Sequence, residues 1–173
     1  MPAHWKTPRR CRFVTMKTEE LARAALETLA AQEMHLATAE SCTGGLIGKY
    51  LTDVAGASSV YVGGVISYVN DVKERLLGVQ RDTLRVYTAV SRQSAHEMAR
   101  GARKATGAEA AVSVTGLAGP DGDGTGRPIG LVYIALDTDG FSYCRELHLS
   151  GSRAQIREDA VRAVFALILE FLG

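Results

Sequence analysis

Short apolar segments alternate along this chain with longer segments whose apolar residues recur at helical spacing, and this alternation restricts the fold more than any other feature. In the first helical segment Leu21, Ala25 and Leu29 recur every fourth residue and form one apolar face. The expected order is helix, strand, helix, strand, two helices, three strands and a final helix. Helices interleaved with strands pack on both faces of one sheet. The sequence therefore predicts an α/β fold, a single three-layer α/β/α domain with a mixed sheet.

Several expected elements have recognisable ends. Thr18 is the expected N-cap of the first helix, and Asn70 is that of a short helix that ends at Gly78. Ser91 caps the next long helix, and Ser152 opens a capping box before the last one. The expected helices cover residues 18–34, 43–54, 71–77, 91–106 and 152 onward. The expected strands cover residues 35–40, 59–68, 110–115, 129–136 and 141–149, of which the last two form a hairpin.

The composition is that of an ordinary globular protein. Hydrophobic residues make up 46% and charged residues 23% of the 173 residues. A chain of this length buries roughly 70% of its unfolded surface and needs no disulfide or structural metal to hold a core. The three cysteines are scattered and form no CxxC pair, so a reduced, cytoplasmic setting is expected. No apolar run reaches about 18 residues, so no membrane span is expected.

Charge is unevenly distributed along the chain. The chain has 20 basic and 19 acidic side chains, but five basic and no acidic ones lie within residues 1–17. The remaining 15 basic and 19 acidic side chains leave the rest mildly acidic, which argues against nucleic acid as the main partner. We expect residues 1–16 to be a disordered, dispensable basic tail and residues 17–173 to be the folded domain, although the tail would also suit a nucleic-acid arm.

Two segments resemble known ligand loops but lack the residues that those loops need. Gly44–Lys49 resembles a phosphate-binding loop, yet Thr43 and Tyr50 stand where such a loop has Gly and Ser or Thr. Asp121–Gly126 resembles a calcium loop, but its twelfth position is Val132 instead of a bidentate Glu. The histidines also lie far apart in the sequence. We therefore expect neither a bound metal nor a cofactor.

Ser41 stands where a predicted strand turns into a helix, a position at which α/β proteins place their sites. The backbone N–H groups of Thr43, Gly44 and Gly45 would lie in the first turn of that helix and would be free to hold a developing oxyanion. The glycines would also let a ligand approach the backbone. Ser41 is therefore a candidate nucleophile, and the alternative interpretation is that it merely caps the helix.

Lys73 lies after the next strand end, in the first turn of the helix that Asn70 is expected to cap. A serine nucleophile needs a base, and a neutral lysine can serve if its pKa falls well below the usual value of about 10.4. Burial and the positive helix end would both lower that pKa. Tyr68 could then hydrogen-bond Ser41 or Lys73 and align the pair. The alternative is a surface lysine that pairs with a neighbouring carboxylate.

A glycine-rich loop, residues 116–127, follows a third strand and offers backbone N–H groups to an anion or an amide. An irregular loop without a function is an equally good interpretation. Arg153 and Arg157 lie one turn apart at the start of the last helix, where they would meet a phosphate or lie in solvent. At the third strand end and in the loop we expect the site residues Thr115, Gly116, Ala118 and Gly119. Asn70 is also expected to contact the substrate.

Taken together, these segments resemble the C-terminal domain of the CinA (competence/damage-inducible) family, and within it the stand-alone nicotinamide mononucleotide (NMN) deamidases. The resemblance covers about residues 18–173. Near Ser91 the family usually reads His-Gly-Ala-Val-Ser, whereas this chain has Tyr87 and Thr88 in the first two positions, which puts the local loop shape in question. The matching segments are residues 38–45 (TAESCTGG), 64–73 (GVISYVNDVK), 89–91 (AVS), 113–122 (SVTGLAGPDG) and 128–130 (PIG).

The resemblance implies hydrolysis of the NMN carboxamide to nicotinate mononucleotide and ammonia, a step of pyridine nucleotide salvage, without a metal. It implies that Ser41 is the nucleophile, Lys73 the general base and Tyr68 an assisting residue, with the phosphate bound by backbone N–H groups and an arginine. A homo-oligomer is also expected. Two alternatives stay open: a non-catalytic nucleotide-binding or interaction domain linked to competence or DNA damage, and an amidase for another small substrate.

Overall fold

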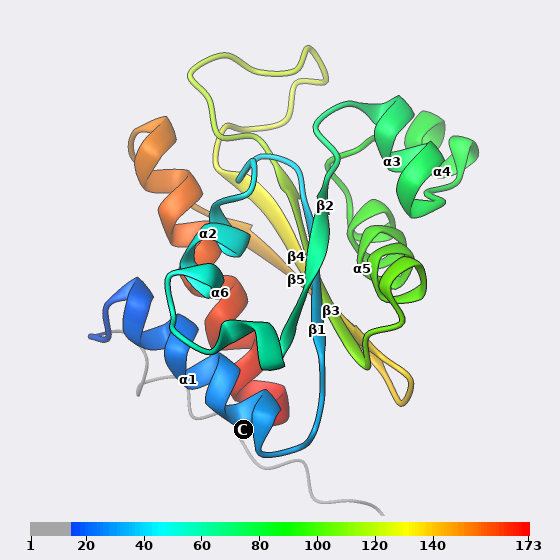
Figure 1. Ribbon diagram of the computed structural model, residues 1–173. Helices are drawn as coiled ribbons and strands as arrows, with labels where there is room; N and C mark the ends of the chain where they lie inside the picture. Colours follow the sequence, from blue (N-terminus) through cyan, green and yellow to red (C-terminus); the bar gives the residue numbers. More distant parts are fainter. Residues whose placement is uncertain (1–14) are drawn as a thin grey trace, which may run out of the picture.

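Five strands form one mixed sheet in the order β2-β1-β3-β4-β5 in the computed structural model, which describes residues 15–173 (Figure 1). Strand β1 lies between β2 and β3 and runs parallel to both, whereas β4 is antiparallel to β3 and to β5. The predicted mixed sheet is therefore confirmed. The strands are β1 (Leu36–Glu40), β2 (Tyr61–Ile66), β3 (Ala110–Gly116), β4 (Leu131–Thr138) and β5 (Ser142–His148).

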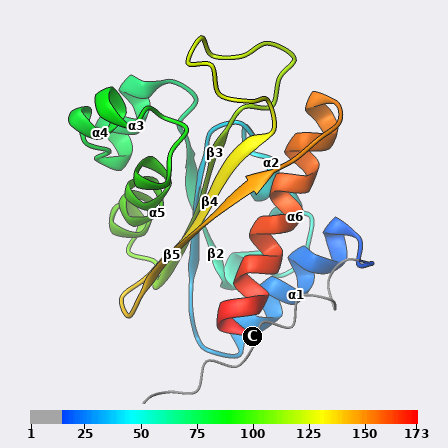
Figure 2. The ribbon, with the colours of Figure 1, turned by 180° about the vertical axis from the view of Figure 1, so that it is seen from behind.

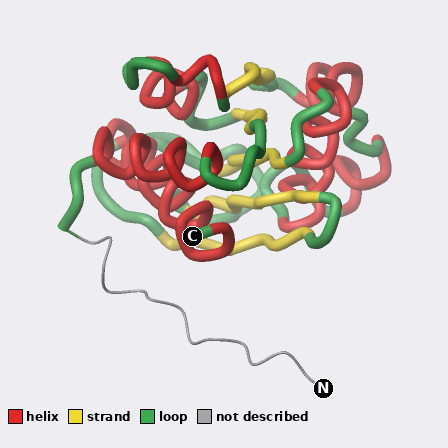
Figure 3. The backbone as a smooth tube through the Cα atoms, turned by 60° about the horizontal axis from the view of Figure 1, so that its bottom comes forward, coloured by secondary structure: helices red, strands yellow, loops and turns green. Residues whose placement is uncertain are grey.

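Helices cover both faces of this sheet, which confirms the predicted three layers. Helices α1, α2 and α6 lie on one face, and α3, α4 and α5 lie on the other (Figures 1 and 2). Figure 3 shows the strands between these two sets of helices. Among the described residues, no helix is both long and apolar enough to cross a bilayer. The helices are α1 (Thr18–Ala30), α2 (Leu46–Thr52), α3 (Asn70–Leu77), α4 (Arg81–Val86), α5 (Arg92–Thr106) and α6 (Arg153–Leu172).

The two faces of the central strands are buried in different kinds of core. Leu36 and other large side chains on one face pack with α1 and α6, around residues such as Phe165. On the other face Ala37 and Ala39 of β1 pack with Met98 of α5. Because these alanines are small, α5 lies close to the sheet. Every residue of β1 is buried, as expected for a parallel strand covered on both faces.

Helix α3, which carries Lys73, packs against α5 at a close approach of two backbones. A Cβ atom added to Gly101 of α5 would lie 1.9 Å from the carbonyl oxygen of Leu77, the last residue of α3. Glycine is therefore needed at this position for steric reasons. This contact sets how closely α3, the helix that carries Lys73, approaches α5.

Several predicted helix boundaries are wrong by a few residues. The first helix ends at Ala30 instead of residue 34, and Lys17 rather than Thr18 is its N-cap. Asn70 is the first residue of α3 and not its cap, which is Val69. By contrast, Ser91 and Ser152 cap α5 and α6 as predicted: each side-chain oxygen accepts a hydrogen bond from the backbone N–H three residues later.

Two short elements differ from the prediction for the middle of the chain. The second helix begins at Leu46 instead of residue 43, because Gly44 and Gly45 have positive φ angles of 61° and 97° and form a turn. The sequence predicts no element for the residues of helix α4. This helix has six residues, of which Thr83 alone is buried, so it carries no apolar periodicity that would have indicated a helix.

The tail predicted for residues 1–16 falls almost entirely on residues 1–14, which lie outside the described residues. The glycine-rich segment forms the long loop between β3 and β4. It extends beyond the carboxyl ends of β1, β2 and β3, at the end of the domain opposite the C-terminus (Figure 1). The carboxyl ends of these strands are where the candidate site lies.

Candidate active site

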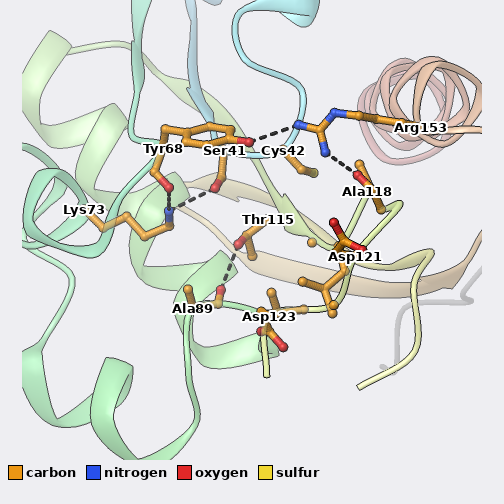
Figure 4. A pocket seen from close by; sticks show the side chains of 15 residues that line it. Ser41, Cys42, Tyr68, Lys73, Ala89, Thr115, Ala118, Asp121, Asp123 and Arg153 are labelled. Atoms are coloured by element: carbon orange, nitrogen blue, oxygen red, sulfur yellow. Dashed lines mark hydrogen bonds between the residues drawn. The ribbon is translucent and has the colours of Figure 1, made fainter. Parts of the chain in front are cut away.

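Ser41 and Lys73 meet at the carboxyl ends of β1 and β2. Ser41 follows β1 directly, and its backbone N–H donates to the carbonyl of Val114 in β3 at 3.0 Å. Lys73 lies on α3, the helix that follows β2. Its Nζ atom lies 2.9 Å from Ser41 Oγ (Figure 4). Two residues 32 positions apart are therefore within hydrogen-bond reach of one another, the geometry required of a nucleophile and its base.

Lys73 is buried, with a relative exposure of 1%. Its Nζ atom also donates to the carbonyl oxygens of Ser67 at 2.5 Å and Tyr68 at 3.5 Å. Within residues 15–173 no carboxylate forms an ion pair with it, and the neighbouring Glu74 pairs with Arg81 instead. Burial lowers the pKa of Lys73 from its ordinary value of 10.5 to about 8. The alternative of a surface lysine paired with a carboxylate is therefore wrong.

Cys42, next to Ser41, is a second side chain in the pocket that could act as a nucleophile. Its thiol is buried, and burial raises the pKa of Cys42 to about 11. A cysteine reacts as the thiolate, which is scarce at neutral pH when the pKa is that high. Ser41, which contacts the only lysine buried in the described part of the chain, is the better candidate.

The hydroxyl of Tyr68 is held by an arginine and not by the Ser41–Lys73 pair. The tyrosine side chain is exposed, and its hydroxyl accepts a hydrogen bond from Arg153 Nη2 at 3.0 Å. The other terminal nitrogen of Arg153 donates to the carbonyl of Gly119 at 2.5 Å. Arg153 therefore links the end of β2 to the loop after β3. The expected hydrogen bond from the Tyr68 hydroxyl to Ser41 or Lys73 is not among those that the structure shows.

These residues surround a pocket of about 290 Å³. Figure 4 shows Lys73, Ser41 and Tyr68 on one side of the pocket and Asp121 on the other. Thr115 lies between them, and its hydroxyl donates to the Ala89 carbonyl at 2.8 Å. Among the described residues, no group of three or more His, Cys, Asp and Glu side chains could hold a metal ion. The predicted site residues that line the pocket are Ser41, Tyr68, Lys73, Thr115, Gly116, Ala118, Gly119 and Arg153.

Comparisons with known proteins identify the family of this chain. A family model described as CinA C-terminal domain matches residues 18–172.

The chain belongs to the CinA C-terminal domain family.

Relatives with known sequences or structures agree. A CinA-like protein of Syntrophomonas wolfei is 46% identical over 137 residues, which cover 79% of this chain and 33% of that protein. The chain thus spans about a third of the length of the curated relatives it matches. The crystal structure of competence damage-inducible protein A from Klebsiella pneumoniae has a TM-score of 0.89 and 34% identity, covering 91% of this chain and 98% of that one. The competence/damage inducible protein CihA from Agrobacterium tumefaciens has a TM-score of 0.85 and 40% identity, covering 88% and 93%.

The predicted oxyanion donors of this CinA domain need correction. The Gly44 N–H donates to the Ser41 carbonyl at 3.1 Å, and the Gly45 N–H donates to Glu40 Oε2 at 3.0 Å. Both groups are occupied, and neither glycine lines the pocket. The N–H groups of Cys42 and Thr43 donate to no other residue within the described chain. Of the three predicted donors, Thr43 alone has an N–H group without another partner in the described chain, but Thr43 does not line the pocket, whereas Cys42 does.

Glu40 holds the turn beside the site and was missed by sequence reasoning. Its carboxylate is buried and accepts hydrogen bonds from Thr43 Oγ1 at 2.7 Å and from the backbone N–H groups of Gly45, Ile47 and Gly48 at 2.9–3.1 Å. A carboxylate at this place satisfies the first-turn donors of α2 and complements the helix dipole. An acidic residue shortly before a Gly-Gly turn and a helix is the sequence signal that could have indicated this role.

Two other predicted site residues lie outside the pocket. Arg157 donates to the carbonyls of Cys42 at 3.1 Å and Thr43 at 2.7 Å, so it supports the turn after Ser41 from behind. Asn70 is exposed at the start of α3 and is not among the residues that line the pocket. Arg153 is therefore the arginine that a ligand in this pocket would meet.

Proposed function

We propose that this CinA domain hydrolyses the carboxamide of NMN to nicotinate mononucleotide and ammonia through Ser41 and Lys73. The observation that carries the proposal is the 2.9 Å contact between Lys73 Nζ and Ser41 Oγ in a buried place without a partner carboxylate. A lysine with a pKa of about 8 has a substantial neutral fraction at physiological pH. The choice of NMN rests on the resemblance of the motifs to those of the NMN deamidases.

The contacts of Lys73 suit a neutral amine that accepts a proton. A neutral amine has two N–H bonds, which can donate to the carbonyls of Ser67 and Tyr68. Its lone pair is then left for the hydroxyl hydrogen of Ser41. As Ser41 Oγ attacks the carboxamide carbon, its proton passes to Lys73 Nζ, and the carbonyl oxygen becomes an oxyanion. The N–H group of Cys42, a residue that lines the pocket next to the nucleophile, donates to no other residue in the described chain and is the candidate donor to this oxyanion.

The same lysine serves the second half of the reaction. The protonated Lys73 gives its proton to the amide nitrogen, the C–N bond breaks, and ammonia leaves the acyl-enzyme. A water molecule then attacks the ester carbon and passes a proton to Lys73. When the ester bond breaks, Lys73 returns that proton to Ser41 Oγ and nicotinate mononucleotide is released. Each cycle consumes one water and restores both side chains.

The rest of the pocket suits a small anionic substrate. Its volume of about 290 Å³ is at the lower end of the range for small-molecule sites. Arg153 lines the pocket, and its positively charged guanidinium is held in place by a hydrogen bond to the Tyr68 hydroxyl. We assign the substrate phosphate to this arginine together with backbone N–H groups of the loop after β3.

The test is ammonia release from NMN by the purified protein. Nicotinamide and glutamine are the control substrates, and the Ser41→Ala variant is the control protein. The proposal predicts that the wild-type protein releases ammonia from NMN and that the Ser41→Ala variant does not. Release from glutamine or nicotinamide in preference to NMN would assign the site to another amide. No release from any of the three would contradict an amidase and favour a binding domain.

A further inference from the structure

One wall of the pocket is fastened by a residue that does not itself line it. The loop residues 117–119 and 121–123 form one wall, and Ala89 and Val90, in the connection between α4 and α5, form another. Both walls are segments outside helices and strands. Arg127, farther along the same loop, bridges them.

Arg127 makes three hydrogen bonds to the connection between α4 and α5. Its Nη1 atom donates to Thr88 Oγ1 and to the carbonyl of Val90, and its Nη2 atom donates to the carbonyl of Tyr87 at 3.0 Å. Within residues 121–129 every residue except Arg127 is exposed. The guanidinium therefore packs against the connection, while the neighbouring residues 121–126 and 128–129 are exposed.

The connection is a fixed anchor for these bonds. Thr88 has a φ angle of 68°, a conformation that is rare for a β-branched residue and is kept only where surrounding contacts hold it. Its carbonyl accepts hydrogen bonds from the hydroxyls of Ser91 at 2.9 Å and Ser94 at 2.7 Å. Thr115 at the end of β3 holds the next carbonyl, that of Ala89, at 2.8 Å. The Thr88 hydroxyl also accepts a hydrogen bond from Arg127.

We propose that Arg127 is a positioning residue that clamps the loop after β3 onto the connection between α4 and α5, and so sets the shape of the pocket opposite Lys73. Figure 4 shows Asp121 and Asp123 on that side of the pocket. The clamped wall would contact the part of the substrate that does not react. Loss of the clamp should therefore weaken substrate binding and change the chemical step less. The effect on KM rests on the proposed function, whereas the effect on the loop does not.

The experiment compares Arg127→Ala, Arg127→Lys and a control, Arg85→Ala. Arg85 is an exposed arginine on α4 that pairs with Asp82 at 3.2 Å and does not line the pocket. Hydrogen–deuterium exchange is measured without substrate for peptides covering residues 117–126 and 87–91, and KM and kcat are measured for NMN. Melting temperatures confirm that each variant is folded.

Arg127→Ala should speed exchange in the loop by about tenfold or more. It should also raise KM by about tenfold while kcat changes by less. Arg127→Lys keeps a charged donor and should restore part of both effects, and Arg85→Ala should change neither. Unchanged exchange in Arg127→Ala, or a fall in kcat at constant KM, would overturn the proposal. If Arg127→Ala does not fold, Arg127→Lys becomes the test. Faster loop exchange than in the wild type would support the proposal, and an unchanged rate would overturn it. Absence of turnover by the wild-type protein would refute the proposed function alone, since exchange would still decide the role of Arg127.

Discussion

Replacing Lys73 with Met should stabilise the domain most at neutral pH and progressively less at alkaline pH. Methionine has a similar length, fits irregular core space and carries no charge. Burial lowers the pKa of Lys73 from 10.5 to about 8. Since one pKa unit corresponds to about 1.4 kcal/mol, keeping this amine protonated in the folded protein costs roughly 3 kcal/mol below pH 8. The Met variant avoids that cost but loses the hydrogen bonds to Ser41 and Ser67, each worth about 1 kcal/mol.

The sign of the pH dependence follows from proton binding. Between pH 8 and 10.5 the unfolded chain holds a proton on Lys73 that the folded protein has released, so the free energy of unfolding of the wild type rises with pH. The Met variant lacks this contribution. Its free-energy advantage over the wild type should therefore fall by roughly 2 kcal/mol between pH 7 and pH 9.5.

Urea denaturation of both proteins across this pH range measures the effect. Lys104→Met is the matched control, because Lys104 lies exposed on α5 and its replacement should leave the pH dependence of the wild type unchanged. If the unfolding free energies of the wild type and the Lys73→Met variant ran parallel from pH 7 to pH 9.5, the depressed pKa of Lys73 would be refuted.

Three further predictions follow from the same contacts. The kcat/KM for NMN should rise with pH, about tenfold per unit, until it levels off near pH 8, because only the neutral form of Lys73 can accept the Ser41 proton; a profile without a rise in this range would contradict a lysine base. Gly101→Ala should cost about 1–3 kcal/mol in urea denaturation and lower kcat, because its Cβ would push Leu77 and α3 away; normal stability and kcat would show that α3 is not held there. Glu40→Gln should cost about 2 kcal/mol or more of unfolding free energy, because an amide nitrogen cannot accept the hydrogen bonds that end on Glu40; a stability equal to that of the wild type would contradict the anchoring role.

The sequence was sufficient for the architecture and for the meeting point of the site. Ser41, Lys73 and Gly116 each follow a predicted strand, and the carboxyl ends of parallel neighbours meet at one edge of a sheet. The structure brings all three into one pocket. Those positions depend on backbone topology, which hydrophobic periodicity determines over many residues.

The partners of individual polar side chains could not be predicted in the same way. Arg153 and Arg157 are one turn apart on α6 and look equivalent in the sequence. Arg153 reaches Tyr68 in the pocket, whereas Arg157 reaches the backbone of Thr43 behind it. Which group each guanidinium meets depends on how α6 is rotated against the turn after β1. That rotation is set by packing, so a local pattern does not contain it.

The kcat of the Lys73→Arg variant for ammonia release from NMN tests the central claim most directly. Arginine keeps the positive charge but stays protonated, so it cannot accept the proton of Ser41. The account predicts a loss of about 10³-fold or more, similar to that of Ser41→Ala, because nucleophile and base act as one unit. A Lys73→Arg variant with nearly normal kcat and a raised KM would contradict it, since Lys73 would then only bind the substrate.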